Sequence, residues 1–170
     1  FIDYAIVDDF IVPSENNKFF TEKLIKLNGC YQVTDNKRPI PKPKTKKEFG
    51  LPEDKFIFCS FNNTYKIQPE MFNVWMEILN TKQDSVLWLL EQDDEIKNNL
   101  LHAAKLKGIG KERIIFSKKI SNHEHIQRQM CADLFLDTFP ICAHTTASDA
   151  LWVGLPLITM SGKSMVSRVA

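Results

Sequence analysis

The chain has 170 residues, of which 44% are apolar and 25% charged, and its formal net charge at pH 7 is +1. This length can bury one complete hydrophobic core, or one core and part of another. The near-neutral charge argues against nucleic acid or an anionic membrane as a partner, because neither would be attracted by long-range electrostatics. No apolar run approaches the roughly 18 residues that span a bilayer, and the four cysteines are too dispersed for a zinc site or a disulfide framework. We therefore expect a cytoplasmic protein with a small ligand.

The first third of the chain predicts little regular structure. Residues 2–7 form a β-branched run that indicates a strand, and apolar residues in 19–27 recur at the spacing of a helix face. Residues 30–33 are consistent with another short strand. One strand, one helix and a further short strand are thus expected before the prolines begin.

A proline-rich segment separates this part from the rest. Three alternating prolines within residues 38–44 remove backbone donors and hold the chain extended. We interpret residues 39–49 as a linker between two domains. Its lysines could form a nucleic-acid patch, but without interleaved aromatic residues a solvated linker is the better interpretation. The chain has no initial Met and stops in residues 164–170 where a helix begins, so we expect it to be cut from a longer protein.

From residue 50 onward, apolar strands alternate with amphipathic helices. The predicted strands are residues 56–61, 85–90, 113–117, 132–137 and 157–160, and the predicted helices begin at Pro69 and cover 93–107, 122–130 and 145–153. Such alternation predicts a Rossmann-like α/β domain whose parallel sheet is covered on both faces. Ligands of these folds bind outside the carboxyl ends of the strands. The loops that deserve inspection are therefore residues 62–68, 118–125 and 138–146.

The loop after the fourth predicted strand contains a candidate phosphate site. His144, Thr145 and Thr146 begin a helix, where hydroxyls and free backbone N–H groups gather. The same threonines could simply cap the helix, and no glycine-rich dinucleotide motif is present. Asp149, one turn further on, would face the same crevice and could accept hydrogen bonds from ribose hydroxyls.

The other two loops contribute cationic and aromatic groups. Lys66 could neutralise a phosphate leaving group or be an ordinary surface lysine, and Asn63 could be only a turn residue. His125 and Arg128 are three residues apart and share a helix face, and a ring beside a guanidinium suits stacking on a base. His123 points about 200° away from His125 on a helix, which argues against a shared metal ion.

Six motifs, in order along the chain, together resemble the catalytic region of the O-GlcNAc transferase family, which includes the plant SPINDLY branch. They are Phe61–Ile67, Ser85–Leu90, Arg113–Ser117, Leu136–Thr138, His144–Thr146 and Asp149–Pro156. The variants Phe139-Pro140 and Ala147-Ser148 resemble the bacterial branch. The resemblance implies a GT-B architecture, in which two Rossmann-like domains face each other across a cleft.

The resemblance also implies a division of the chain. Residues 1–38 would end the N-terminal catalytic domain, residues 39–49 would link it onward, and residues 50–170 would form the nucleotide-sugar-binding domain, truncated at its C-terminus. The TPR repeats of the family would lie outside this chain.

Site residues follow from the same resemblance. Lys66 matches the family's catalytic lysine, which contacts the diphosphate, and Asn63 stands where animal enzymes have a Gln near the phosphates. The implied substrate-binding residues are His125 and Arg128 for uracil, Asn63 near the phosphates, His144, Thr145 and Thr146 on the phosphates, and Asp149 for the ribose. Asn122 replaces a lysine that lies against the nucleoside in animal enzymes, which could mean a different nucleotide.

The implied reaction is inverting transfer of N-acetylglucosamine from UDP-GlcNAc to Ser or Thr of acceptor proteins. The resemblance implies no metal and no cofactor, because the nucleotide sugar is a substrate, and no D-x-D carboxylate pair is present. Two alternatives stay open: a SPINDLY-like protein O-fucosyltransferase that uses GDP-fucose, and a nucleotide-binding fragment with no activity of its own. The related sugar-nucleotide epimerases match the motif set less closely.

Overall fold

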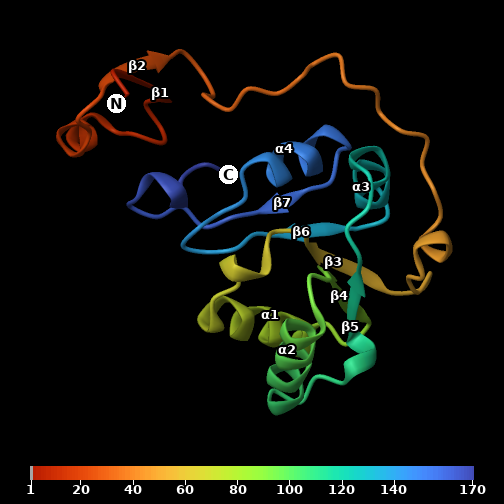
Figure 1. The fold of residues 1–170 in the computed structure, drawn as a ribbon. Helices are drawn as coiled ribbons and strands as arrows, with labels where there is room; N and C mark the ends of the chain where they lie inside the picture. Colours follow the sequence, from red (N-terminus) through yellow and green to blue (C-terminus); the bar gives the residue numbers. More distant parts are fainter. Residues whose placement is uncertain (1) are drawn as a thin grey trace.

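A five-stranded parallel sheet dominates the molecule in a computed structural model that describes residues 2–170 (Figure 1). The strand order is β5-β4-β3-β6-β7, and every neighbouring pair runs parallel. The strands are β3 (Phe56–Ser60), β4 (Ser85–Leu90), β5 (Ile114–Ser117), β6 (Leu134–Leu136) and β7 (Leu157–Ile158). The helices are α1 (Pro69–Thr81), α2 (Asp94–Leu106), α3 (Asn122–Gln129) and α4 (Thr145–Trp152). The predicted parallel α/β domain is confirmed.

Helices cover both faces of this sheet, which explains why its strands are apolar on both sides. In β4, Val86 and Trp88 belong to a core shared with α4, whereas Leu87 and Leu89 belong to a core shared with α1 and α2. Figure 1 shows the same division, with α1 and α2 on one side of the sheet and α3 and α4 on the other. Because parallel strands are buried on both faces, their sequences lack the polar alternation of a half-exposed sheet.

Within residues 2–170, five short 3-10 helices lie between or beside these elements. They are Ser14–Phe19, Lys46–Phe49, Thr64–Lys66, Lys111–Arg113 and Met165–Ser167. The second begins within the predicted linker, where Thr45 and Glu48 form a reciprocal capping box. Residues 39–45 have neither helix nor strand, as the prolines predict.

The N-terminal part forms a separate two-stranded parallel sheet of β1 (Tyr4–Asp8) and β2 (Lys23–Leu27). The helix predicted for residues 19–27 is therefore wrong, and residues 30–33 form no strand. The helical spacing was misleading because Phe20 and Leu24 pack against Val7, Ile11 and Val12 from an extended backbone. Pairing with β1 along its whole length overrides the weak local preference of this short segment.

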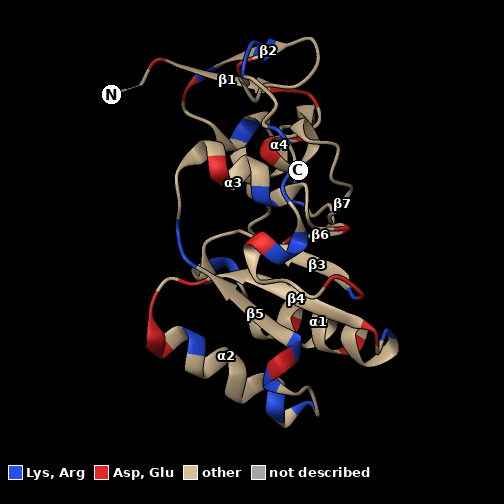
Figure 2. Ribbon diagram, turned by 90° about the vertical axis from the view of Figure 1, so that its right-hand side faces the viewer, with Lys and Arg blue, Asp and Glu red and all other residues tan. Residues whose placement is uncertain are grey.

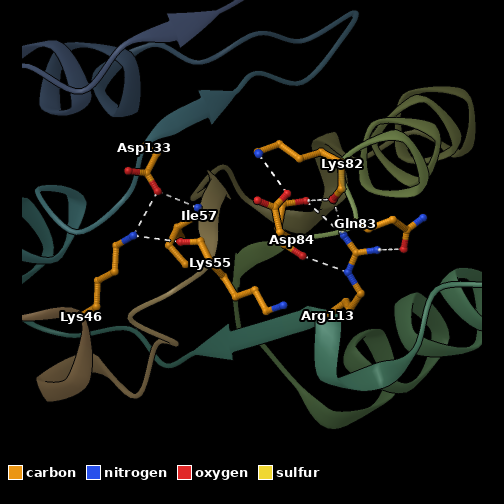
Figure 3. Close-up of polar contacts among 9 residues, drawn as sticks. Lys46, Lys55, Ile57, Lys82, Gln83, Asp84, Arg113 and Asp133 are labelled. Atoms are coloured by element: carbon orange, nitrogen blue, oxygen red, sulfur yellow. Dashed lines mark hydrogen bonds and ion pairs between the residues drawn. The ribbon is translucent and has the colours of Figure 1, made fainter.

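The amino-terminal edge of the larger sheet is closed by polar contacts (Figure 3). Lys46 Nζ donates to Lys55 O at 3.0 Å and contacts Asp133 Oδ2 at 3.2 Å. The same Asp133 oxygen accepts the Ile57 N–H at 2.7 Å. Arg113 joins β5 to β4, because it donates to the main chain of Ser85 at 2.9 Å.

Charges are well mixed on the surface. Figure 2 shows acidic and basic residues interspersed along α2 and α3, in keeping with a net charge of +1. In the part of the chain that the structure describes, none of the helices combines the length and the apolar character that crossing a membrane requires.

Candidate functional site

A cavity of about 440 Å³ opens at the carboxyl-terminal edge of the sheet, where β3, β4 and β5 end. Its lining comes from the loops after these strands and from α3, namely Phe61, Asn63, Leu90, Glu91, Gln92, Lys119, Ile120, Asn122, His125 and Arg128. This edge is where parallel α/β folds bind their ligands. The sequence interpretation overlooked Glu91 and Gln92, although their position directly after a buried strand was a sufficient signal.

His125 and Arg128 lie together in this cavity, as the sequence predicts. Arg128 Nε donates to His125 Nδ1 at 3.0 Å, and its Nη1 donates to Lys118 O at 2.9 Å. A guanidinium can only donate, so His125 Nδ1 is an acceptor and its proton is on Nε2. Burial, reinforced by the charge of Arg128, lowers the pKa of His125 to about 4. The imidazole is therefore neutral at physiological pH, with Nε2–H as its free donor.

Arg128 has an unusual environment for a cation. Its side chain is 1% exposed, and its guanidinium lies 4.4 Å from the ring centroid of Phe61 and 5.9 Å from that of Trp88. Burial lowers the pKa of Arg128 to about 10, so it remains charged at neutral pH. Among the described residues no carboxylate forms an ion pair with it. The group thus orients His125 and stacks on the cavity wall.

Lys66 and His144 lie close to each other at the start of α4, and neither lines the cavity. Lys66 Nζ donates to Cys142 O at 2.9 Å, in the loop that leads into α4. Burial lowers the pKa of His144, and the positive charge of Lys66 lowers it further. His144 Nε2 is buried and has no hydrogen-bond partner. The ammonium of Lys66 and an imidazole nitrogen without a hydrogen-bond partner therefore lie near the start of α4.

Thr145 and Thr146 form the first turn of α4, as predicted. Thr145 is exposed, whereas the Thr146 hydroxyl donates to Asn62 Oδ1 at 2.6 Å. Asn62 in turn contacts Asp137 at the end of β6, at 2.9 Å. Neither Asn62 nor Asp137 was identified from the sequence, although both follow or end strands at this edge.

The remaining predicted residues have partners within the chain. Asn63 is exposed, and its Oδ1 accepts a hydrogen bond from Gln92 Nε2 at 2.9 Å. It lines the cavity and does not lie at the first turn of α4. Asp149 is buried, and one of its oxygens pairs with Arg38 Nη1 at 2.5 Å. The negative charge of Asp149 raises the pKa of His125, against the larger lowering by burial and by Arg128. Asp149 is therefore close enough to act electrostatically on a residue of the cavity. Asp149 is thus not an ordinary exposed residue of a helix surface.

No group of three or more His, Cys, Asp or Glu residues that could hold a metal ion occurs within residues 2–170. The described cysteines are all free, and Cys59 and Cys131 are buried. The polar groups at this edge are therefore amides, hydroxyls, imidazoles, cations and dispersed carboxylates.

A parallel α/β domain with its cavity at the carboxyl edge of the sheet corresponds to the catalytic region of GT-B glycosyltransferases. The profile of glycosyl transferase family 41 matches residues 42–170, and the chain belongs to this family. The whole chain is 41% identical to the probable UDP-N-acetylglucosamine–peptide N-acetylglucosaminyltransferase SEC of Arabidopsis thaliana, of which it spans 18%. It is 39% identical to the Caenorhabditis elegans UDP-N-acetylglucosamine–peptide N-acetylglucosaminyltransferase over 74% of its length and 11% of that relative.

A solved structure shows the same fold. A mutant of the O-GlcNAc transferase of Thermobaculum terrenum superposes with a TM-score of 0.83 at 25% identity, over 98% of this chain and 32% of that one. The chain thus spans 18% and 11% of the two relatives and about a third of this structure.

Proposed function

We propose that this chain is the donor-binding part of an inverting protein O-glycosyltransferase, which transfers N-acetylglucosamine from UDP-GlcNAc to Ser or Thr of acceptor proteins. Family 41 membership supports the reaction class. The names of the plant and nematode relatives support UDP-N-acetylglucosamine as donor and a peptide as acceptor.

The nucleoside would occupy the cavity beside α3. Neutral His125 offers an aromatic face and an Nε2–H donor, and Arg128 holds that ring in place. The free oxygen of Asp149 would accept from the ribose, and Asn63 would lie near the phosphates at the cavity wall. This arrangement suits a flat base followed by a hydroxyl-bearing sugar.

The diphosphate would lie against the first turn of α4. Departure of the nucleotide diphosphate builds negative charge, and groups already placed to meet that charge stabilise the transition state more than the ground state. The ammonium of Lys66, the imidazole of His144 and the backbone N–H groups of Thr145 and Thr146 are such groups. Because these groups carry the charge, we propose that no metal ion takes part.

One observation carries this proposal: Lys66 Nζ is 2.9 Å from Cys142 O, which puts the ammonium directly before His144 and α4. We expect Lys66→Ala in the full-length protein to lower the rate of transfer by about 10²–10³ or more while the fold survives, as circular dichroism would show. Turnover at the wild-type rate would contradict the assignment. In the same assay EDTA should leave the rate unchanged, and inhibition by EDTA that is reversed by added Mg²⁺ would disprove the metal-free mechanism.

The nucleotide base is tested by calorimetric titration with UDP and with GDP. We expect UDP to bind more tightly than GDP, and we expect His125→Ala to lose this preference. Preference for GDP would instead support a protein O-fucosyltransferase. Binding of UDP-GlcNAc without transfer by the full-length protein would favour a nucleotide-binding module.

A further inference from the structure

Asp137 organises the junction between β3, β6 and α4. Its Oδ1 accepts the backbone N–H groups of Thr138 and Ala143, each at 2.7 Å, and its Oδ2 accepts the Thr159 hydroxyl at 2.7 Å. The residue is 5% exposed. A carboxylate surrounded by donors in this way can only accept, so any further side chain that contacts Oδ1 must present a donor.

Asn62 is that further side chain, and its orientation is thereby fixed. Its Nδ2 lies 2.9 Å from Asp137 Oδ1 and 2.8 Å from Thr138 Oγ1. Thr138 Oγ1 already donates to Ile141 O at 2.8 Å, so it too can only accept from Asn62. Both amide hydrogens are therefore used, and Asn62 Oδ1 must face the opposite way, toward α4.

The direction of the next hydrogen bond follows. Asn62 Oδ1 cannot donate, so at 2.6 Å the Thr146 hydroxyl gives its only hydrogen to it. Asn62 is 2% exposed, which shields this bond from competing water. The Thr146 oxygen is left with lone pairs alone, and lone pairs do not stabilise a phosphate oxygen.

We propose that Asn62, held by Asp137, is a positioning residue of the donor site. It accepts the hydrogen bond of the Thr146 hydroxyl and so ties the first turn of α4 to the end of β3. This inference rests on the proposed function and refines it. The diphosphate then receives its hydrogen bonds from Lys66 and from the backbone N–H groups of the turn. The Thr146 hydroxyl acts on the ligand only through the position of the helix.

A double-mutant cycle on UDP affinity tests this assignment in the full-length protein. We expect Asn62→Ala and Thr146→Val each to raise the Kd for UDP about tenfold, because each breaks the same hydrogen bond. The double variant should also be weakened about tenfold rather than a hundredfold, since the bond can be lost only once. If the two losses multiply to about a hundredfold, Thr146 contacts the phosphate independently of Asn62 and the inference is wrong.

Two controls separate positioning from general stability. Thr159→Val removes another donor to Asp137 but leaves the Asn62 bond to Thr146 intact, so it should lower Tm with less than about a threefold change in Kd. Thr146→Ser keeps the hydroxyl and should bind UDP within about twofold of wild type. A Kd that follows Tm across all variants would overturn the positioning role. If Asn62→Ala does not fold, Asn62→Ser replaces it in the cycle, because its short hydroxyl cannot reach both partners.

The outcome for the wild-type protein distinguishes this inference from the proposed function. If the wild-type protein does not bind UDP, the proposed function itself is contradicted. If the wild-type protein binds UDP but the increases in Kd of the two single variants multiply in the double variant, only the role of Asn62 is contradicted.

Discussion

The two edges of the five-stranded sheet use similar residues in opposite ways. At the amino-terminal edge, Lys46, Arg113 and Asp133 bind main-chain atoms of neighbouring elements and hold the strand starts together (Figure 3). At the carboxyl-terminal edge, Lys66 and Arg128 also donate to main-chain carbonyls, but they border a cavity and a helix N-terminus. A hydrogen bond from a lysine or arginine to a main-chain carbonyl therefore does not show by itself whether the residue has a structural or a ligand-binding role. The edge of the sheet at which the residue lies separates the two roles.

This difference has a physical origin in parallel sheets. The carboxyl ends of the strands and the N-termini of the following helices meet at one edge, so backbone N–H groups without partners gather there. At the other edge, helices end and strands begin, and their carbonyl groups attract cationic side chains such as Arg113 and Lys46. One edge is therefore suited to bind an anion, and the other is suited to close the fold.

The largest expected contrast is between two matched lysines. Lys46 and Lys66 are both half-buried and each donates to a main-chain carbonyl, at 3.0 and 2.9 Å. We expect Lys46→Ala to leave the rate of transfer unchanged and to lower the free energy of unfolding by about 1 kcal/mol. The loss of rate expected for Lys66→Ala corresponds to about 3–4 kcal/mol in the activation free energy. Urea unfolding and steady-state kinetics on both variants would check this, and a catalytic defect in Lys46→Ala would break the contrast.

A smaller contrast is expected between two arginines. Arg113 donates to the carbonyls of Ser85 and Lys82, at 2.9 and 2.7 Å, so Arg113→Met should cost about 1–3 kcal/mol of stability with unchanged UDP affinity. Arg128 is buried as a cation without a carboxylate, and such groups contribute little net stability. Arg128→Met should therefore unfold near wild-type denaturant concentrations but bind UDP more weakly, because His125 loses its orienting donor. Equal effects of the two variants on both quantities would show that edge position is irrelevant.

The regular part of the fold was predictable because its signals are strong and local. Strands apolar on both faces, alternating with amphipathic helices, specified the parallel sheet, and Pro69 marked the first turn of α1. Residues 19–27 were mispredicted because only their pairing with β1 makes them extended. The spacing of apolar residues within a nine-residue segment does not reveal long-range strand pairing of this kind.

The sequence predicted which residues gather at the carboxyl edge of the sheet, but not the hydrogen bonds among them. His125 and Arg128 share a helix face by spacing alone, whereas the neutral state of the ring depends on its burial, to which Phe61 contributes from another loop. Asn62 and Asp137 are 75 residues apart in sequence and meet only because β3 and β6 are neighbours. Sequence reasoning therefore found the groups in the loops at this edge better than the buried groups that hold these loops in place.

The smallest expected effect is the dependence of stability on pH at the carboxyl edge. The pKa of His125 is lowered from 6.5 to about 4, so between these values the unfolded chain binds a proton that the folded chain does not. The free energy of unfolding should consequently fall as pH is lowered from 6.5, by up to about 1.4 kcal/mol per pH unit. Urea unfolding of wild type and His125→Gln at pH 6.5 and 5.5 would check this. The free energy of unfolding should depend less on pH in His125→Gln than in wild type.

His123 provides the matched control, because it lies exposed on the same helix. His123→Gln should leave the slope of wild type intact. If His125→Gln unfolds with the wild-type slope, the proton balance comes from other groups, such as His144, whose pKa is also lowered by burial and by Lys66. That result would shift the titrating group from the cavity to the start of α4, but it would keep it at the carboxyl edge. If His123→Gln instead removes the dependence of the unfolding free energy on pH, the neutral, Arg128-oriented imidazole assumed in the proposed base recognition would be contradicted.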